Sequence, residues 1–84
     1  MILNKYKIAD FPIGIIIRAI KTDSTYYITK GNLYEITNSW ELRNSIDIMI
    51  NFKNDNNGLV NKAINGAILD GVLQYPFDEF FEIL

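Results

Sequence analysis

The chain has 84 residues, carries 8 basic and 10 acidic residues for a net charge of −2, and contains neither cysteine nor histidine. A chain of this length is expected to form one domain with a thin stability margin, on the order of 5 kcal/mol. Without these two residue types, disulfides, thiolate zinc sites and histidine catalysis are excluded, so we expect no enzyme, no cofactor and no metal site. The charge balance argues against a strongly basic nucleic-acid binder.

The N-terminal region, MILNKYKIADFPIGIIIRAI, mixes charged and apolar residues. It does not have the pattern of a signal peptide, and no apolar run approaches the ~20 residues that span a bilayer. We therefore expect a soluble, cytoplasmic protein without a membrane partner. Residues 1–13 are interpreted as an N-terminal extension and residues 14–84 as the folded domain. The β-branched run at 13–21 predicts a strand buried on both faces, or nearly so.

The stretch YYITKGNLYEI, residues 26–36, combines three tyrosines with a Lys-Gly-Asn break. Gly31 is predicted to be a turn residue, because glycine lets the chain reverse direction sharply. Tyr34 is then expected to plug one end of a small barrel. Tyr26 and Tyr27 precede the turn, and strand alternation would send one inward and the other outward. Either ring is a candidate for contact with a partner.

Two segments with alternating hydrophobicity follow, and each predicts a strand with one buried face. In the first, the apolar side chains share one face: Tyr34, Ile36, Trp40 and Leu42. Asn38 interrupts that face and can mark a bulge or a strand end. In the second segment, at 45–53, the apolar face is formed by Ile46, Ile48, Ile50 and Phe52. A tight turn is expected between the segments, at Arg43-Asn44.

Asparagine and glycine mark the next turns. The run NDNNGL, residues 54–59, is typical of a tight hairpin, since both residue types tolerate positive φ. A third strand is expected from Leu59 to Ile64. Asn65-Gly66 then predicts the turn of an extra hairpin within residues 59–74. Some apolar residues there also have helical spacing, but the neighbouring glycines favour strand over helix.

The C-terminal segment PFDEFFEIL gathers aromatic and acidic residues. A short helical turn is predicted at 77–81, because proline suits a helix start and acidic groups favour its first turn. Three phenylalanines in five residues are hard to bury together, and an exposed remainder would mark a partner site. Trp40 is a second candidate, although its apolar face favours the core. The candidate partner-binding residues are Tyr26, Tyr27, Trp40, Phe77, Asp78, Glu79, Phe80 and Phe81.

The order of these features resembles a group of short SH3-like β-barrel proteins that are common in phages and prophages of Gram-positive bacteria. The matching residues are Ile28, Thr29, Lys30, Gly31, Leu33, Tyr34, Glu35 and Ile36, followed by Tyr75, Pro76, Phe80 or Phe81, and Glu82. The resemblance implies a mainly β fold, a small SH3-like barrel of five to six strands. The long stretch 59–74 departs from the family pattern and is the place for a feature particular to this chain.

The resemblance and the lack of catalytic residues together predict a non-enzymatic phage-type protein that binds a host protein and modulates or inhibits it, for instance in anti-defence. Self-association into a homo-oligomer through a free strand edge is also expected. Two alternatives stay open. One is a nucleic-acid-binding barrel that uses the N-terminal basic residues Lys5, Lys7, Arg18, Lys21 and Lys30. The other is a structural subunit of a phage assembly.

Overall fold

The computed structural model describes residues 6–42 and 47–84, and over these residues the protein is mainly β. In chain order the elements are the 3-10 turn η1 (Ile8–Asp10), β1 (Ile16–Ala19), β2 (Leu33–Glu41), β3 (Ile48–Lys53), β4 (Leu59–Ala63), β5 (Ile68–Leu69), β6 (Val72–Leu73), the 3-10 turn η2 (Phe77–Glu79) and β7 (Phe81–Ile83).

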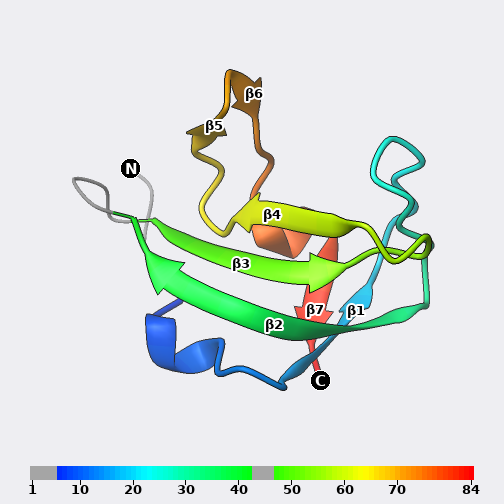
Figure 1. Cartoon of the computed structure of the whole chain (residues 1–84), viewed down its shortest axis with the longest axis horizontal. Helices are drawn as coiled ribbons and strands as arrows, with labels where there is room; N and C mark the ends of the chain where they lie inside the picture. The colour runs from blue at the N-terminus through cyan, green and yellow to red at the C-terminus, as the bar shows by residue number, and fades with distance from the viewer. Residues whose placement is uncertain (1–5, 43–46) are drawn as a thin grey trace.

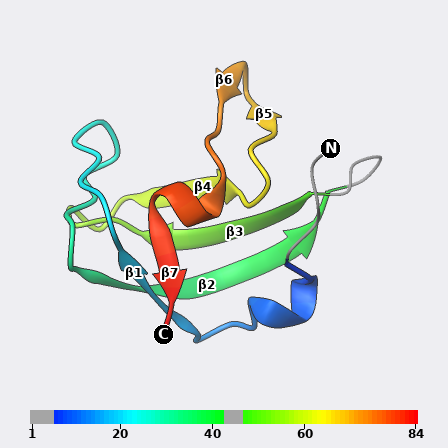
Figure 2. The ribbon, with the colours of Figure 1, turned by 180° about the vertical axis from the view of Figure 1, so that it is seen from behind.

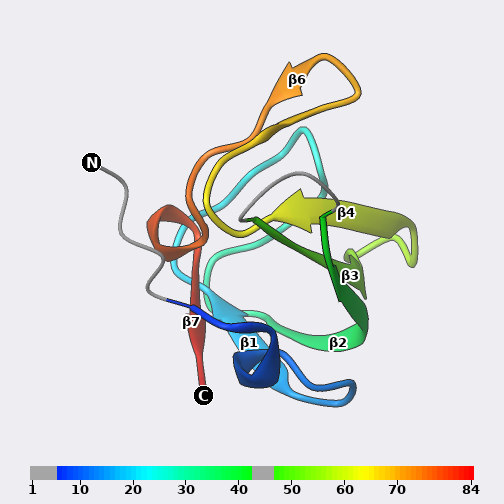
Figure 3. The same ribbon diagram turned by 90° about the vertical axis from the view of Figure 1, so that its left-hand side faces the viewer.

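Five strands form one antiparallel sheet in the order β4-β3-β2-β1-β7, and β5 pairs with β6 in a separate hairpin that projects from the body (Figure 1). The larger sheet curls around the core, as the view from its side shows (Figure 3). It is not closed, because within the described residues β4 and β7 remain its two edges. The mainly β prediction is thus confirmed, and the closed barrel is not.

Aromatic side chains fill the inside of the curled sheet. Phe81 of β7 packs its ring against Phe52 of β3, with 5.3 Å between centroids, and against Phe77 of η2 at 5.5 Å. Tyr34 joins the same cluster, 5.5 Å from Phe52. The Phe77 amide also donates to the Ile64 carbonyl at 2.8 Å, which ties η2 to the end of β4. The expected helical turn therefore exists as η2, which lies in front of β3 and β4 in the view of Figure 2.

The segment expected to be an extension contributes to this core. Phe11 is fully buried, and its ring lies 5.3 Å from that of Phe77. Its carbonyl accepts a hydrogen bond of 2.6 Å from the Ser39 hydroxyl on β2. Tyr6, Ile8 and Phe11 therefore pack as part of the same hydrophobic unit as the sheet.

A bulge in β2 corrects the predicted face of Trp40. Between Ile36 and Asn38 the strand advances two residues while its partner β3 advances one, so one extra residue is inserted. Because side chains alternate with a period of two, the insertion reverses the inward and outward positions that follow. Ser39 now lies opposite the buried Ile50, and Trp40 turns outward with 38% of its surface exposed. Asn38 was the visible sign of this irregularity.

The prediction that the β-branched run would be buried on both faces is wrong for β1. Ile17 and Ala19 are buried, whereas Arg18 between them is exposed. The Arg18 guanidinium forms an ion pair of 2.8 Å with Glu82 of β7. One face of β1 is thus available to solvent.

The extra hairpin exists, but its turn was predicted at the wrong pair. Asp70 and Gly71 both have positive φ, 50° and 77°, and connect β5 to β6. Asp-Gly suits the two-residue hairpin turn for the same reason as Asn-Gly. Asn65-Gly66 instead forms a corner after β4. The third strand is confirmed at Leu59–Ala63, and the expected Arg43-Asn44 turn, like Ile46, lies outside the described residues.

Candidate functional site

A cleft of about 450 Å³ lies between the loop at 22–28 and the β5–β6 hairpin. Both segments rise on the same side of the molecule (Figure 3). The loop wall consists of Thr22, Asp23, Ser24, Thr25 and Tyr26. The hairpin wall consists of Val72, Leu73, Gln74 and Tyr75. The remaining lining residues, which are mostly buried, form the floor: Ile28, Lys62, Phe80 and Phe81.

Hydrogen bonds within the loop at 22–28 fix its conformation. Asp23 and Ile28 exchange two backbone hydrogen bonds, of 2.8 and 3.0 Å. The Asp23 carboxylate accepts a further bond of 3.1 Å from the Thr25 amide. Tyr27 adopts a positive φ of 58°, a conformation uncommon for a bulky residue, so the chain reverses tightly before the buried Ile28. The loop therefore forms a defined wall.

Hydrogen bonds around Tyr34 attach this loop to the β3–β4 turn. The Tyr34 hydroxyl accepts from the Thr29 amide at 2.9 Å and donates to the Asp55 carboxylate at 2.8 Å. Asp55 also accepts from the Thr29 hydroxyl at 2.6 Å. Burial raises the pKa of Tyr34, and the hydrogen bonds from Thr29 and Tyr34 lower the pKa of Asp55. Gly31 turns at φ 91°, as predicted, and Tyr34 is buried.

A buried carboxylate fixes the corner from which the hairpin departs. Asp47 is 4% exposed and accepts backbone hydrogen bonds from Asn65 at 2.8 Å and from Ala67 at 3.1 Å. Gly66 lies between them at φ 88°, and a Cβ there would meet the Gln74 carbonyl oxygen at 2.9 Å. The two arms of the hairpin therefore approach each other closely at its base.

The hairpin itself exposes apolar side chains. The exposed fractions are 71% for Ile68, 47% for Val72, 57% for Leu73 and 54% for Tyr75. None of these residues belongs to the hydrophobic core cluster of the sheet. A two-stranded hairpin is at best marginally stable alone in water, so its attachment at the Asp47 corner matters for its position.

Lys62 is the chemically unusual residue of the cleft. Its side chain points inward from β4, only 7% of the residue is exposed, and its Nζ donates to the Tyr75 carbonyl oxygen. The same nitrogen lies 5.5 Å from the centre of the Phe80 ring. Burial lowers the pKa of Lys62 to about 8, although the negative charges of Asp23, Asp47 and Glu79 act in the opposite direction.

The structure brings together only some of the residues chosen from the sequence. Tyr26, Phe80 and Phe81 line the cleft. Tyr27 is exposed on the same loop but outside the lining, and Trp40 lies on β2, which contributes no lining residue.

The other candidates belong to η2. Phe77 is fully buried in the core, while Asp78 and Glu79 are exposed. The three C-terminal phenylalanines thus differ: Phe77 and Phe81 are buried, and Phe80 is half-buried at the cleft.

Sequence reasoning predicted an extra hairpin within residues 59–74, but it named neither Lys62 nor the residues of the hairpin wall as candidates. A signal for Lys62 was present, because Val60, Lys62 and Ile64 alternate along one strand and share its apolar face. Nothing in the local pattern indicated that Tyr75 and Phe80 would meet that amine.

Comparisons of the chain with protein-family models, with curated proteins and with solved structures gave no match. Within residues 6–42 and 47–84, no group of three or more acidic, histidine or cysteine side chains is arranged to hold a metal ion. In the same part of the chain, every helix is too short or too polar to cross a membrane.

Proposed function

We propose that the chain is a non-enzymatic, phage- or prophage-type protein that binds a host protein in the cytoplasm and modulates or inhibits it. The observation that carries the proposal is the β5–β6 hairpin, which presents Ile68, Leu73 and Tyr75 to solvent. Apolar area removed from water stabilises a complex by roughly 25 cal/mol per Å² before the costs of association. A partner that covers these side chains would gain that stabilisation.

Two further features support a binding role. The hairpin follows β4, in the stretch that departs from the SH3-like pattern, and none of the residues of β5 and β6 belongs to the core cluster that contains Phe52 and Phe81. The cleft at its base adds a concave surface with polar and apolar walls. We include an SH3-like fold with an open sheet in the proposal, supported by the curled antiparallel sheet, the Gly31 turn and the buried Tyr34.

A capture experiment tests the proposal. The immobilised protein is exposed to a lysate of a Gram-positive bacterium, and retained proteins are identified by mass spectrometry. A variant with Ile68→Asp and Leu73→Asp is compared with Leu33→Asp, since Leu33 and Leu73 are equally exposed, at 57%. We expect the wild type and Leu33→Asp to retain the same host protein in stoichiometric amount, and the double variant to retain less than a tenth of it. No captured protein, or equal capture by the double variant, would contradict the proposal.

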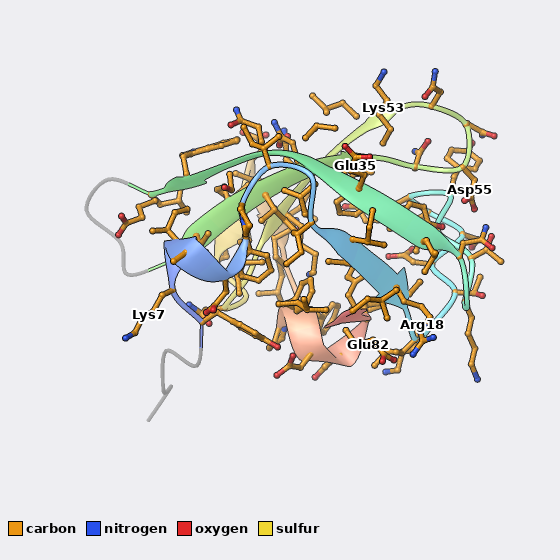
Figure 4. The ribbon with its side chains drawn as sticks, turned by 90° about the horizontal axis from the view of Figure 1, so that it is seen from below. Lys7, Arg18, Glu35, Lys53, Asp55 and Glu82 are labelled. Atoms are coloured by element: carbon orange, nitrogen blue, oxygen red, sulfur yellow. The ribbon has the colours of Figure 1, made fainter. Side chains whose placement is uncertain are left out.

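The nucleic-acid alternative has less support. Arg18 forms an ion pair with Glu82, which reduces the local positive charge, and Lys7 lies at the other end of the molecule in the view of Figure 4. Phosphate binding by proteins depends on several cations acting together and weakens steeply with salt. Glu35 and Lys53 also bring both signs of charge to the outer surface of the sheet (Figure 4).

A further inference from the structure

Lys62 is a buried amine whose hydrogen-bonding capacity is only partly used. An ammonium group has three N–H donors, and Lys62 directs one to the Tyr75 carbonyl oxygen. Phe80 offers the face of its ring, 5.5 Å away, which attracts a cation but accepts no strong hydrogen bond. Lys62 makes no ion pair with any residue that the structure describes. Two of its donors therefore have no partner from the described chain.

Three carboxylates influence Lys62 from different elements without contacting it: Asp23 on the loop, Asp47 before β3, and Glu79 on η2. Asp47 is occupied by the amides of the hairpin corner, and Asp23 by the Thr25 amide. Their combined attraction does not compensate for burial, and the pKa of Lys62 stays lowered to about 8. A buried cation without a contacting anion is costly, and an anion that reaches it removes much of that cost.

We propose that this cleft binds the carboxylate of an acidic side chain that a partner protein presents next to an apolar residue. The carboxylate accepts hydrogen bonds from the free donors of Lys62. The apolar neighbour packs against Leu73 and Tyr75, which line the hairpin wall and are largely exposed. The positive charge of Lys62 thus favours an acidic side chain, and the apolar hairpin wall favours an apolar residue beside it in the partner.

The size of the cleft and two hydroxyl groups of its opposite wall fit such a group, while the Asp23 carboxylate on that wall accepts a hydrogen bond from the Thr25 amide. Its volume of about 450 Å³ lies within the range of protein pockets that enclose small ligands, and it accommodates an acidic side chain with part of its neighbour. Thr25 and Tyr26 on the loop wall carry hydroxyl groups, which can donate to a second carboxylate oxygen. This inference rests on the proposed function, because it specifies which segment of the bound protein enters the cleft.

Binding of a carboxylate is coupled to the protonation of Lys62. At pH 7 the amine is mostly charged, whereas at pH 9.5 it is mostly neutral in the free protein. The charged groups that act on Lys62 are Asp23, Asp47 and Glu79, from the loop, from the start of β3 and from η2. A neutral amine attracts a carboxylate less, so the affinity for the acidic group falls as pH rises through about 8.

The probes are short capped peptides, titrated into the ¹⁵N-labelled protein while its amide resonances are followed by NMR. Acetyl-Leu-Glu-amide is compared with acetyl-Leu-Gln-amide, which has the same shape and no charge. At pH 7 we expect the Glu peptide to shift amides of residues 22–28 and 72–75, and to bind at least fivefold more tightly than the Gln peptide. At pH 9.5 its affinity should fall by about tenfold. Equal affinities for the two peptides would overturn the proposal.

Variants and a third ligand locate the interaction. Lys62→Met and Lys62→Gln should each lose the preference for the Glu peptide, while Lys53→Met, at an exposed site on β3, should retain it. The spectrum of each variant reports whether it is folded. Retention of the preference in a folded Lys62 variant contradicts the assignment to this amine. Acetyl-leucine provides a free terminal carboxylate, and binding of this ligand alone would contradict recognition of an acidic side chain.

These outcomes are separable from those of the capture experiment. If Ile68→Asp with Leu73→Asp abolishes capture of the host protein but Lys62→Met leaves it unchanged, the proposed function stands and the acidic group in the cleft is refuted. If the peptides bind as expected but no host protein is captured, the cleft assignment stands and the proposed function fails.

Discussion

The alternation of Val60, Lys62 and Ile64 places a charged group on the apolar face of β4, where a strand usually carries a hydrophobic side chain. The strand pairing of β4 directs the Lys62 side chain inward, and its amine there contacts the Tyr75 carbonyl oxygen and the Phe80 ring. Among the residues that the structure describes, Lys62 is buried without an ion pair, which is unfavourable for stability alone because apolar residues of similar size often stabilise such sites. A binding role gives a physical reason for the lysine.

The first prediction concerns the dependence of stability on pH. The folded-state pKa of Lys62, about 8, lies below its ordinary value of 10.5. Between these pH values the unfolded chain holds a proton that the folded chain has lost, so the free energy of unfolding should rise from pH 8 to pH 10, by about 2 kcal/mol. The raised pKa of Tyr34 opposes this trend only above about pH 10. Urea unfolding at each pH measures the effect.

Two substitutions isolate the contribution of Lys62. Lys62→Met should remove the rise and make the protein at least as stable as the wild type at pH 7. The matched control, Lys53→Met at an exposed position, should preserve it. A Lys62→Met protein whose stability still increases between pH 8 and 10 would show that another group causes the effect.

At the scale of elements, β2 and the β5–β6 hairpin show how local patterns succeed and fail. Alternation correctly indicated that Ile48, Ile50 and Phe52 face inward, because β3 is regular over that stretch. It failed for Trp40, because one extra residue in β2 exchanges the two faces beyond it. Asn38 marked the irregularity, but an asparagine cannot specify whether a strand ends or continues with reversed faces.

The second prediction compares two glycines of the hairpin. Both have positive φ, so Gly71→Ala should cost about 1 kcal/mol of stability from backbone strain alone, since nothing lies near its Cβ position. Gly66→Ala should cost clearly more, because its Cβ would lie 2.9 Å from the Gln74 carbonyl oxygen. Thermal or urea unfolding of both variants measures the difference. Equal losses would mean that the hairpin base is wider than described.

At the scale of the whole molecule, the core and the hairpin are separable. The core consists of η1, the five-stranded sheet and η2, joined by Phe11, Phe52, Phe77 and Phe81. The hairpin and the 22–28 loop stand on this body and enclose the cleft. Stability and the candidate binding surface therefore depend largely on different residues.

The third prediction follows from this separation. The Gln74 amide donates to the Ala67 carbonyl at 3.2 Å, so the hairpin base remains paired if residues 68–73 are replaced by Gly-Gly. We expect the shortened protein to keep its β circular dichroism spectrum and to lose less than about 1 kcal/mol of stability, because the removed side chains are mostly exposed. It should also lose host-protein capture. Unfolding of the shortened chain would show that the hairpin is part of the cooperative core.

The sequence by itself determined the class of the fold and the types of chemistry that the chain lacks. Period-two alternation and Asn/Asp-Gly pairs act over a few residues, so they identify strands and turns without knowledge of the rest of the chain. The lack of histidine and cysteine is likewise a property of composition alone. These features predicted β3, β4, η2 and the turn at Gly31.

Which residues form the cleft depends on the tertiary structure alone. Asp47 binds the amides of Asn65 and Ala67 and thereby sets the direction of the hairpin. Lys62 meets a carbonyl 13 residues away. Each of these contacts joins segments that are distant in sequence, and its geometry depends on how the whole sheet curls. Local sequence patterns do not specify the curvature of the sheet, so they could not indicate which residues would surround the Lys62 amine.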